Sequence, residues 1–150
     1  MRKHLNICIQ IEKTVAQIYR KMAESSKLSP AVRTGLLELA QEEDDHASQL
    51  QFALRFPDGS IVDSLPGMLQ EAERLLQLAQ KALQHVEQNV VSDQQAVNIG
   101  VELEKKFCQA HIGNSFQFKE EHLKSMFSAM AKDDERHCKK LEELKKQCQP

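Results

Sequence analysis

Residues 39–50 read LAQEEDDHASQL, and residues 130–141 read MAKDDERHCKKL. Both stretches open with an apolar residue and alanine, continue through paired acids to a histidine, and place leucine four positions after it. In each, an acid stands three residues before the histidine, as Glu43 before His46 and Asp134 before His137. Residues three apart share a face of an α-helix. The chain therefore carries the same acid-x-x-His helical segment twice.

The repeat extends towards the N-terminus of each segment. Residues 7–12 read ICIQIE and residues 99–104 read IGVELE, so that both apolar runs end in a glutamate, Glu12 and Glu104. Each glutamate precedes its acid-x-x-His segment by almost the same distance. The repeated unit is thus predicted to be a helical hairpin, formed once over residues 3–56 and again over about 93–147.

The rest of the sequence is also typical of helices. Apolar residues recur at steps of three and four, and no alternating pattern predicts a strand. A further helix is expected over about residues 66–88, between the hairpins. An all-α bundle in a single domain over residues 1–150 follows. Helix boundaries and loops are predicted at Ser29-Pro30, PDG (57–59), SIVDSLPG (60–67), Ser92 with Gln95, Gly113-Asn114 and CQP (148–150).

Six ionisable residues fall on the apolar faces of the predicted helices. A buried carboxylate is costly unless it is neutralised or paired. Two histidines cannot balance four acids, no Lys or Arg shares these faces, and two divalent cations would supply the missing charge. Oxygen and imidazole donors suit iron, manganese or zinc. The sequence therefore predicts a dinuclear metal site with these ligands: Glu12, Glu43, His46, Glu104, Asp134 and His137.

A metal-free alternative stays open at this point. The EEDDH and DDERH segments could be solvated faces of a charged helical bundle that acts as an interaction module. This interpretation requires all four helices to turn their acids outward, against the apolar pattern on which each acid lies.

The residues E-K-T-V-A-Q-I-Y (12–19) and L-A-Q-E-E-D-D-H-A (39–47) resemble the first two helices of rubrerythrin-type ferritin-like proteins. The resemblance implies a ferritin-like four-helix bundle made of two repeated hairpins, with an extra connecting helix. It further implies two iron ions and an oxidoreductase that reduces peroxide or dioxygen. By this resemblance Glu43 and Asp134 bridge the metals, Glu12 and Glu104 are terminal ligands, and His46 and His137 each bind one metal.

The chain departs from this family in three respects. Asp134 stands where the family has the longer glutamate, and Phe107 stands where peroxide-reducing members carry a further glutamate. The four cysteines form no C-x-x-C pair, so no rubredoxin domain is expected in this sequence, and electrons are expected from an external donor such as a rubredoxin. An iron-binding protein or ferroxidase, without an organic substrate, has the same ligand set and remains an alternative.

Tyr19, the single tyrosine, and His111 are expected on the metal face. Each is interpreted either as a partner of the ligands or as a core residue with its polar group satisfied. Cys8 and Cys108 are expected to be small buried hydrophobes. The remaining histidines are expected at the surface or at helix ends: His4, His85 and His122. Five acids next to the predicted ligands are expected to be solvated and to be available as partners of the ligand histidines: Glu42, Asp44, Asp45, Asp133 and Glu135.

The composition of the chain argues against some kinds of binding partner. A net charge of −2 with interspersed acids and bases gives no basic surface for nucleic acid or an anionic membrane. We see neither a signal peptide nor a membrane-spanning run, and we expect a cytoplasmic protein. The helix over 66–88 suits either a cover for the bundle or the interface of a homodimer.

Overall fold

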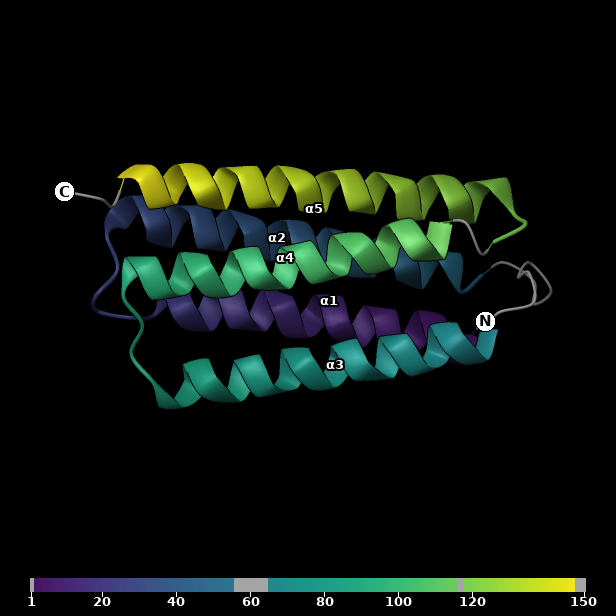
Figure 1. Cartoon of the computed structure of the whole chain (residues 1–150), viewed down its shortest axis with the longest axis horizontal. Coiled ribbons are helices and arrows are strands. Elements are labelled where there is room, and N and C mark those ends of the chain that lie inside the picture. Colours follow the sequence, from purple (N-terminus) through teal and green to yellow (C-terminus); the bar gives the residue numbers. More distant parts are fainter. Residues whose placement is uncertain (1, 56–64, 116–117, 148–150) are drawn as a thin grey trace.

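The structure, a computed structural model, describes residues 2–55, 65–115 and 118–147. These residues form five helices that lie side by side along one long axis (Figure 1): α1 (Arg2–Ala23), α2 (Pro30–Ala53), α3 (Leu65–Gln88), α4 (Asp93–Ser115) and α5 (Glu121–Gln147). The prediction of an all-α bundle is confirmed for this part of the chain. The predicted turn at 57–59, the loop residues 60–64 and the tail 148–150 lie outside the described residues.

Two predicted helix starts are confirmed by their caps. The Ser29 hydroxyl accepts a hydrogen bond from the Val32 amide at the start of α2, with Pro30 in the first helical position. At the start of α4, the Ser92 amide donates to Gln95 Oε1, and the Gln95 amide donates to Ser92 Oγ. This reciprocal pair satisfies two amides that the first helical turn leaves without carbonyl partners.

The predicted break at Gly113-Asn114 is wrong, because α4 continues through both residues to Ser115. The Ser115 hydroxyl donates to the carbonyl of Ile112 and so satisfies one of the last carbonyl groups of the helix. A glycine lowers helix propensity by only about 1 kcal/mol, which the preceding helical turns readily offset.

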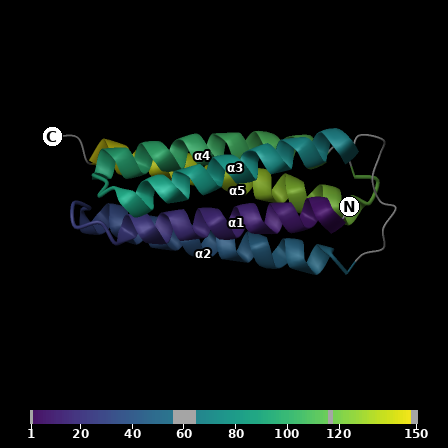
Figure 2. The same ribbon diagram turned by 90° about the horizontal axis from the view of Figure 1, so that it is seen from below.

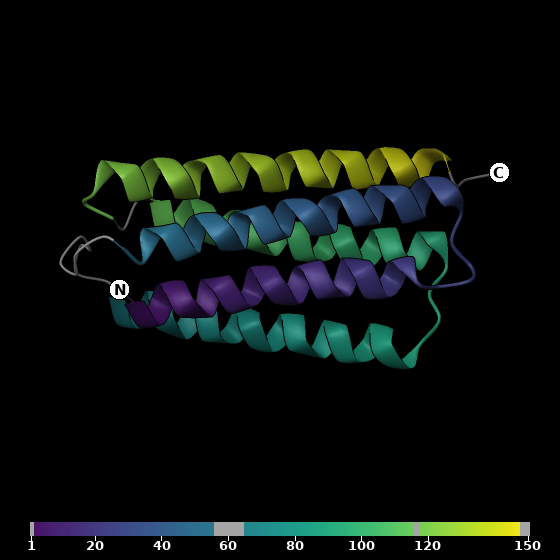
Figure 3. The ribbon, with the colours of Figure 1, turned by 180° about the vertical axis from the view of Figure 1, so that it is seen from behind.

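The chain forms two antiparallel hairpins, α1 with α2 and α4 with α5, which pack against each other mainly through α2 and α5. Figure 1 shows α2 and α4 running in the same direction, with α3 returning the chain between them. α3 lies outside the two hairpins, along α1 and against α4 (Figures 2 and 3). Within one chain α3 therefore covers the bundle.

The apolar core is divided into two clusters. One contains Leu36, Leu39 and Leu141, and the other contains Leu50, Phe127 and Met130. The two acid-x-x-His segments lie between these leucines and aromatic residues on α2 and α5. A buried polar layer therefore crosses the middle of the bundle.

Candidate metal centre

All six predicted ligands lie in this polar layer, and as whole residues they are at most 2 % exposed. Each is on the helix face that the apolar spacing predicted, so the alternative in which all these acids face solvent is excluded for the structure. Glu12 comes from α1, Glu43 and His46 from α2, Glu104 from α4, and Asp134 and His137 from α5.

The structure brings five of these residues into two groups with the spacing of metal ligands. In the first group, Glu12, Glu43 and His46 place one potential ligand atom each within 4.8 Å of the others. In the second group, Glu43, Glu104 and His137 do the same. Glu43 belongs to both groups, so its carboxylate lies between the two hairpins.

Asp134 is equally buried but joins neither group among the described residues. Its Oδ2 accepts a hydrogen bond from His111 Nδ1 at 2.7 Å. Aspartate is one methylene shorter than the glutamate at the matching position of α2. The two acid-x-x-His segments are therefore not equivalent in this structure, although their sequences match.

His111 has more contacts in the polar layer than its sequence position indicated. Besides Asp134, it approaches Glu12, with 3.2 Å between His111 Nε2 and Glu12 Oε1. Tyr19 on α1 makes the corresponding contact with the other hairpin, because its buried hydroxyl donates a hydrogen bond to Glu104 Oε1 on α4. Each of these residues stands two helical turns after one candidate glutamate and contacts the other. Both are thus partners of the candidate ligands.

The outward nitrogens of the two candidate ligand histidines are held by acids from the opposite hairpin. His137 Nε2 lies 3.0 Å from Glu42 Oε2, and His46 Nε2 lies 3.4 Å from Asp133 Oδ2. Arg136 donates hydrogen bonds to both of these carboxylates. Such contacts fix the ring orientation of a metal-binding histidine and leave its other nitrogen for the metal. Sequence reasoning identified the two acids as candidate partners but missed Arg136.

The inward nitrogens face the candidate carboxylates. His46 Nδ1 lies 3.3 Å from Glu43 Oε2 and 3.7 Å from Glu12 Oε2. His137 Nδ1 lies 3.0 Å from Glu43 Oε1 and 3.3 Å from Glu104 Oε2. Two buried oxygens, Glu12 Oε1 and Glu43 Oε1, have no partner in hydrogen-bonding geometry in the described part of the chain, although imidazole nitrogens lie nearby. The donor set therefore leaves carboxylate oxygens free to coordinate, as a cation site requires.

Without a metal, burial and neighbouring charges shift the pKa values of the buried glutamates in opposite directions. Burial favours the neutral form of a carboxyl and, with the Glu104 charge, raises the pKa of Glu43 to about 8. Burial acts the same way on Glu12, but the imidazoles of His111 and His46, which lie 3.2 Å and 3.7 Å from its oxygens, bring its pKa below the ordinary value.

The three imidazoles respond to the same charges. Burial disfavours their charged forms, yet the neighbouring carboxylates raise the pKa of His46 to about 12, of His137 to about 11 and of His111 to about 10. Three imidazolium groups thus compensate most of the acids without a metal. In the sequence, the four acids were balanced against only two histidines, His46 and His137. Because His111 adds a third positive charge, the need for metal cations is smaller than the sequence indicated.

His4 was expected at the surface or at a helix end; it lies in the first turn of α1, but it is buried at 0 % exposure. α1 begins at Arg2, which places His4 one turn before Cys8 on the apolar face, where its ring packs near Phe118 and Phe127. Burial is the main cause that lowers its pKa to about 4. Cys8 and Cys108 are buried free thiols, as predicted. His85 and His122 are exposed, also as predicted.

Comparison of the chain with protein-family models, with curated proteins and with solved structures finds no match. None of the five helices in the described part of the chain has the uninterrupted apolar length that crossing a bilayer requires.

Proposed function

We propose that this chain is a ferritin-like protein of the rubrerythrin type that binds two metal ions in its buried polar layer. The observation that carries the proposal is the position of Glu43, which belongs to both groups of potential ligands. A carboxylate shared by two sites is the arrangement of dinuclear carboxylate proteins, in which facing helices supply two glutamates and two acid-x-x-His pairs.

The order of the helices supports the ferritin-like part of the proposal. Ferritin-like bundles contain one long crossover connection, unlike bundles with only short loops. Here α2 and α4 run in the same direction, so the chain must return along the bundle between them, and α3 provides this connection (Figure 1).

The chain's own residues would have distinct tasks at such a centre. Glu12 and His46 would hold one ion, Glu104 and His137 the other, and Glu43 both, with Asp134 available from α5. Iron or manganese bound by these groups would supply one-electron chemistry towards peroxide or dioxygen. The two apolar clusters exclude bulk water from the ligands, and Tyr19 keeps the Glu104 carboxylate in one orientation through its hydrogen bond.

We infer an oxidoreductase that reduces peroxide or dioxygen with electrons from an external donor protein, such as a rubredoxin. Reduction of one hydrogen peroxide to two waters consumes two electrons and two protons. The described thiols Cys8, Cys108 and Cys138 are free, and among the described residues none of them belongs to a group of potential metal ligands.

Stopped-flow reoxidation tests this function. The iron-loaded, reduced protein is mixed with hydrogen peroxide or with dioxygen, and the rate of spectral change is compared. Reoxidation that is faster with peroxide supports a peroxide reductase. Negligible rates with both oxidants contradict it. Continued oxidation of added Fe(II) beyond about two equivalents per chain indicates an iron-handling ferroxidase instead.

A further inference from the structure

A cavity of about 390 Å³ lies between α1, α3 and α4 and reaches the candidate metal centre from one side only. Its inner end is formed by His4, Cys8, Glu12 and His111. Glu104 and His137, from the second group of candidate ligands, are not among its lining residues. Within the described structure the cavity therefore leads to the half of the polar layer that contains Glu12.

The volume exceeds what peroxide needs. One water molecule occupies about 30 Å³ in the liquid, so the cavity has room for roughly ten water-sized molecules. Cavities of about 300–1,000 Å³ are typical of sites for organic ligands. The size therefore favours an organic molecule.

The walls and the mouth of the cavity differ in chemistry. Apolar side chains form most of the wall: Ile11, Met68, Ala72, Leu75 and Phe107. Arg74, Lys106 and Glu71 also line it. Arg74 is paired with Glu71, with 2.7 Å between Arg74 Nη2 and Glu71 Oε1.

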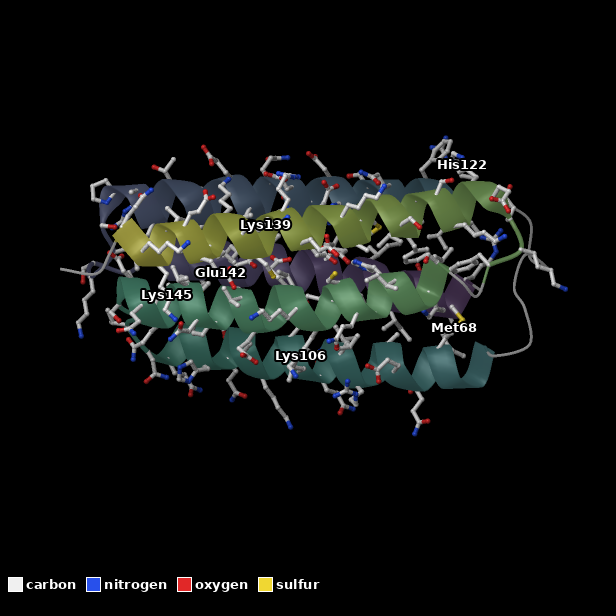
Figure 4. The ribbon with its side chains drawn as sticks, turned by 45° about the horizontal axis from the view of Figure 1, so that its top comes forward. Met68, Lys106, His122, Lys139, Glu142 and Lys145 are labelled. Carbon is white, nitrogen blue, oxygen red and sulfur yellow. The ribbon has the colours of Figure 1, made fainter. Side chains whose placement is uncertain are left out.

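Lys106 leaves one uncompensated positive charge at the cavity. No carboxylate of the described residues lies within 4.0 Å of its ammonium group. Figure 4 shows Lys106 beside α3, with Met68 towards one end of that helix. At the inner end, the Glu12 carboxylate and the His111 imidazole already face each other, with 3.2 Å between His111 Nε2 and Glu12 Oε1. Lys106 is therefore the group at the cavity that is left to attract an anion.

We propose that this cavity binds a small organic carboxylate with an apolar body, whose charged end pairs with Lys106 and whose body points towards Glu12. This inference deepens the proposed function. It rests on that function in one point, the placing of the organic ligand beside a bound metal ion. It assigns a second substrate or effector class, in addition to peroxide or dioxygen, to one half of the centre.

Octanoate binding to the metal-free protein tests this proposal by isothermal titration calorimetry. We expect saturable binding of one octanoate per chain. Lys106→Ala should weaken binding about fivefold, which corresponds to ~1 kcal/mol. Lys139→Ala is the matched control, because Lys139 is exposed on α5 (Figure 4) and should leave the affinity unchanged. Octan-1-ol, which lacks the charge, should bind equally to the wild type and to Lys106→Ala.

A second variant tests the location independently of charge. A Cβ atom added at Gly113, which lines the cavity, meets nothing within 4 Å, so Gly113→Leu should add bulk there. Octanoate binding should weaken in this variant, and circular dichroism should show unchanged helicity. Absent binding, or binding that both Lys106→Ala and Gly113→Leu leave unchanged, would overturn the proposal.

Metal analysis of the same proteins separates the two proposals. Lys106→Ala and Gly113→Leu lie outside the candidate ligands and should retain the metal content of the wild type. If the wild type binds octanoate in a Lys106-dependent way but takes up no metal, the cavity inference stands and the proposed function fails. If metal binds and octanoate does not, the cavity inference alone fails.

Discussion

At the scale of single residues, buried polar groups in this bundle are held by partners on other helices. Tyr19 on α1 donates to Glu104 on α4, and His111 on α4 contacts Glu12 on α1. A polar atom buried without a partner costs about 1–3 kcal/mol. These contacts between the hairpins therefore stabilise one arrangement of the two candidate ligand carboxylates.

Tyr19 provides a direct test of this burial. Burial, followed by the nearby Glu104 charge, raises its pKa well above the ordinary value of about 10. Unfolded protein releases this proton at lower pH than folded protein, so stability should fall as the pH rises past about 10. We expect phenolate absorbance to appear only together with loss of helical circular dichroism.

The assignment of this signal is simple, because the chain has one tyrosine and no tryptophan. The same titration in denaturant should give an ordinary phenol pKa and serves as the control. A folded protein that forms phenolate near the ordinary pKa would contradict the buried position of Tyr19.

At the scale of helices, glycines allow α5 to approach its neighbours. A Cβ atom added at Gly100 on α4 would lie 2.8 Å from Leu141 Cδ1 and 3.3 Å from Tyr19 Cε1. Leu141 is fully buried and has little room to move. At Gly113, on the same helix, an added Cβ atom meets nothing within 4 Å.

This pair of glycines separates packing from helix propensity. Gly113→Ala should stabilise the protein by about 0.5–1 kcal/mol, because alanine is the better helix former. Gly100→Ala gains the same propensity but overpacks the core, which costs about 1–3 kcal/mol, so the net effect should be destabilising. Chemical denaturation measures both, and a stabilising Gly100→Ala would show that α4 and α5 pack less closely than described.

Local sequence patterns predicted the helices well, but they predicted the helix ends less accurately. Ser29-Pro30 and Ser92 with Gln95 predicted starts correctly because capping depends on residues close in sequence. The end of α4 was mispredicted at Gly113-Asn114, since one glycine costs a helix only about 1 kcal/mol and α4 continues through both residues to Ser115. α5 begins at Glu121, and the Glu120 side chain accepts a hydrogen bond from the Leu123 amide.

At the scale of the whole molecule, the groups proposed to bind metal hold protons. His46 and His137 carry protons at neutral pH, because the surrounding carboxylates raise their pKa values to about 12 and 11. Metal ligands must be deprotonated. On the proposed function, metals and protons therefore compete for the same groups.

Metal uptake should consequently release about three protons per chain near neutral pH, from His46, His137 and Glu43, whose pKa is about 8, and affinity should increase with pH. A titration of the metal-free protein with Fe(II) or Mn(II) in weakly buffered indicator solution, under anaerobic conditions, measures the release. Glu102→Gln, which changes an exposed acid on α4, is the control and should release the same number. Metal binding without proton release would contradict the protonation described for these histidines.

The sequence identified all the residues of the polar layer, because acids on apolar helix faces are visible in the spacing. It did not reveal how the two hairpins meet. The contacts of Glu42 with His137 and of Asp133 with His46, both joined by Arg136, depend on the packing of α2 against α5. The burial of His4 and the cavity between α1, α3 and α4 likewise depend on packing that no local pattern contains.

The most direct test of the central claim is elemental analysis of protein purified without an affinity tag, beside Glu43→Gln and the control Glu102→Gln. Glutamine has nearly the shape of glutamate, and circular dichroism should show that both variants fold. The account predicts about two iron or manganese atoms per chain in the wild type and in Glu102→Gln, and their loss in Glu43→Gln. A folded wild type that holds no metal after anaerobic Fe(II) loading would contradict it and would favour a metal-free interaction module.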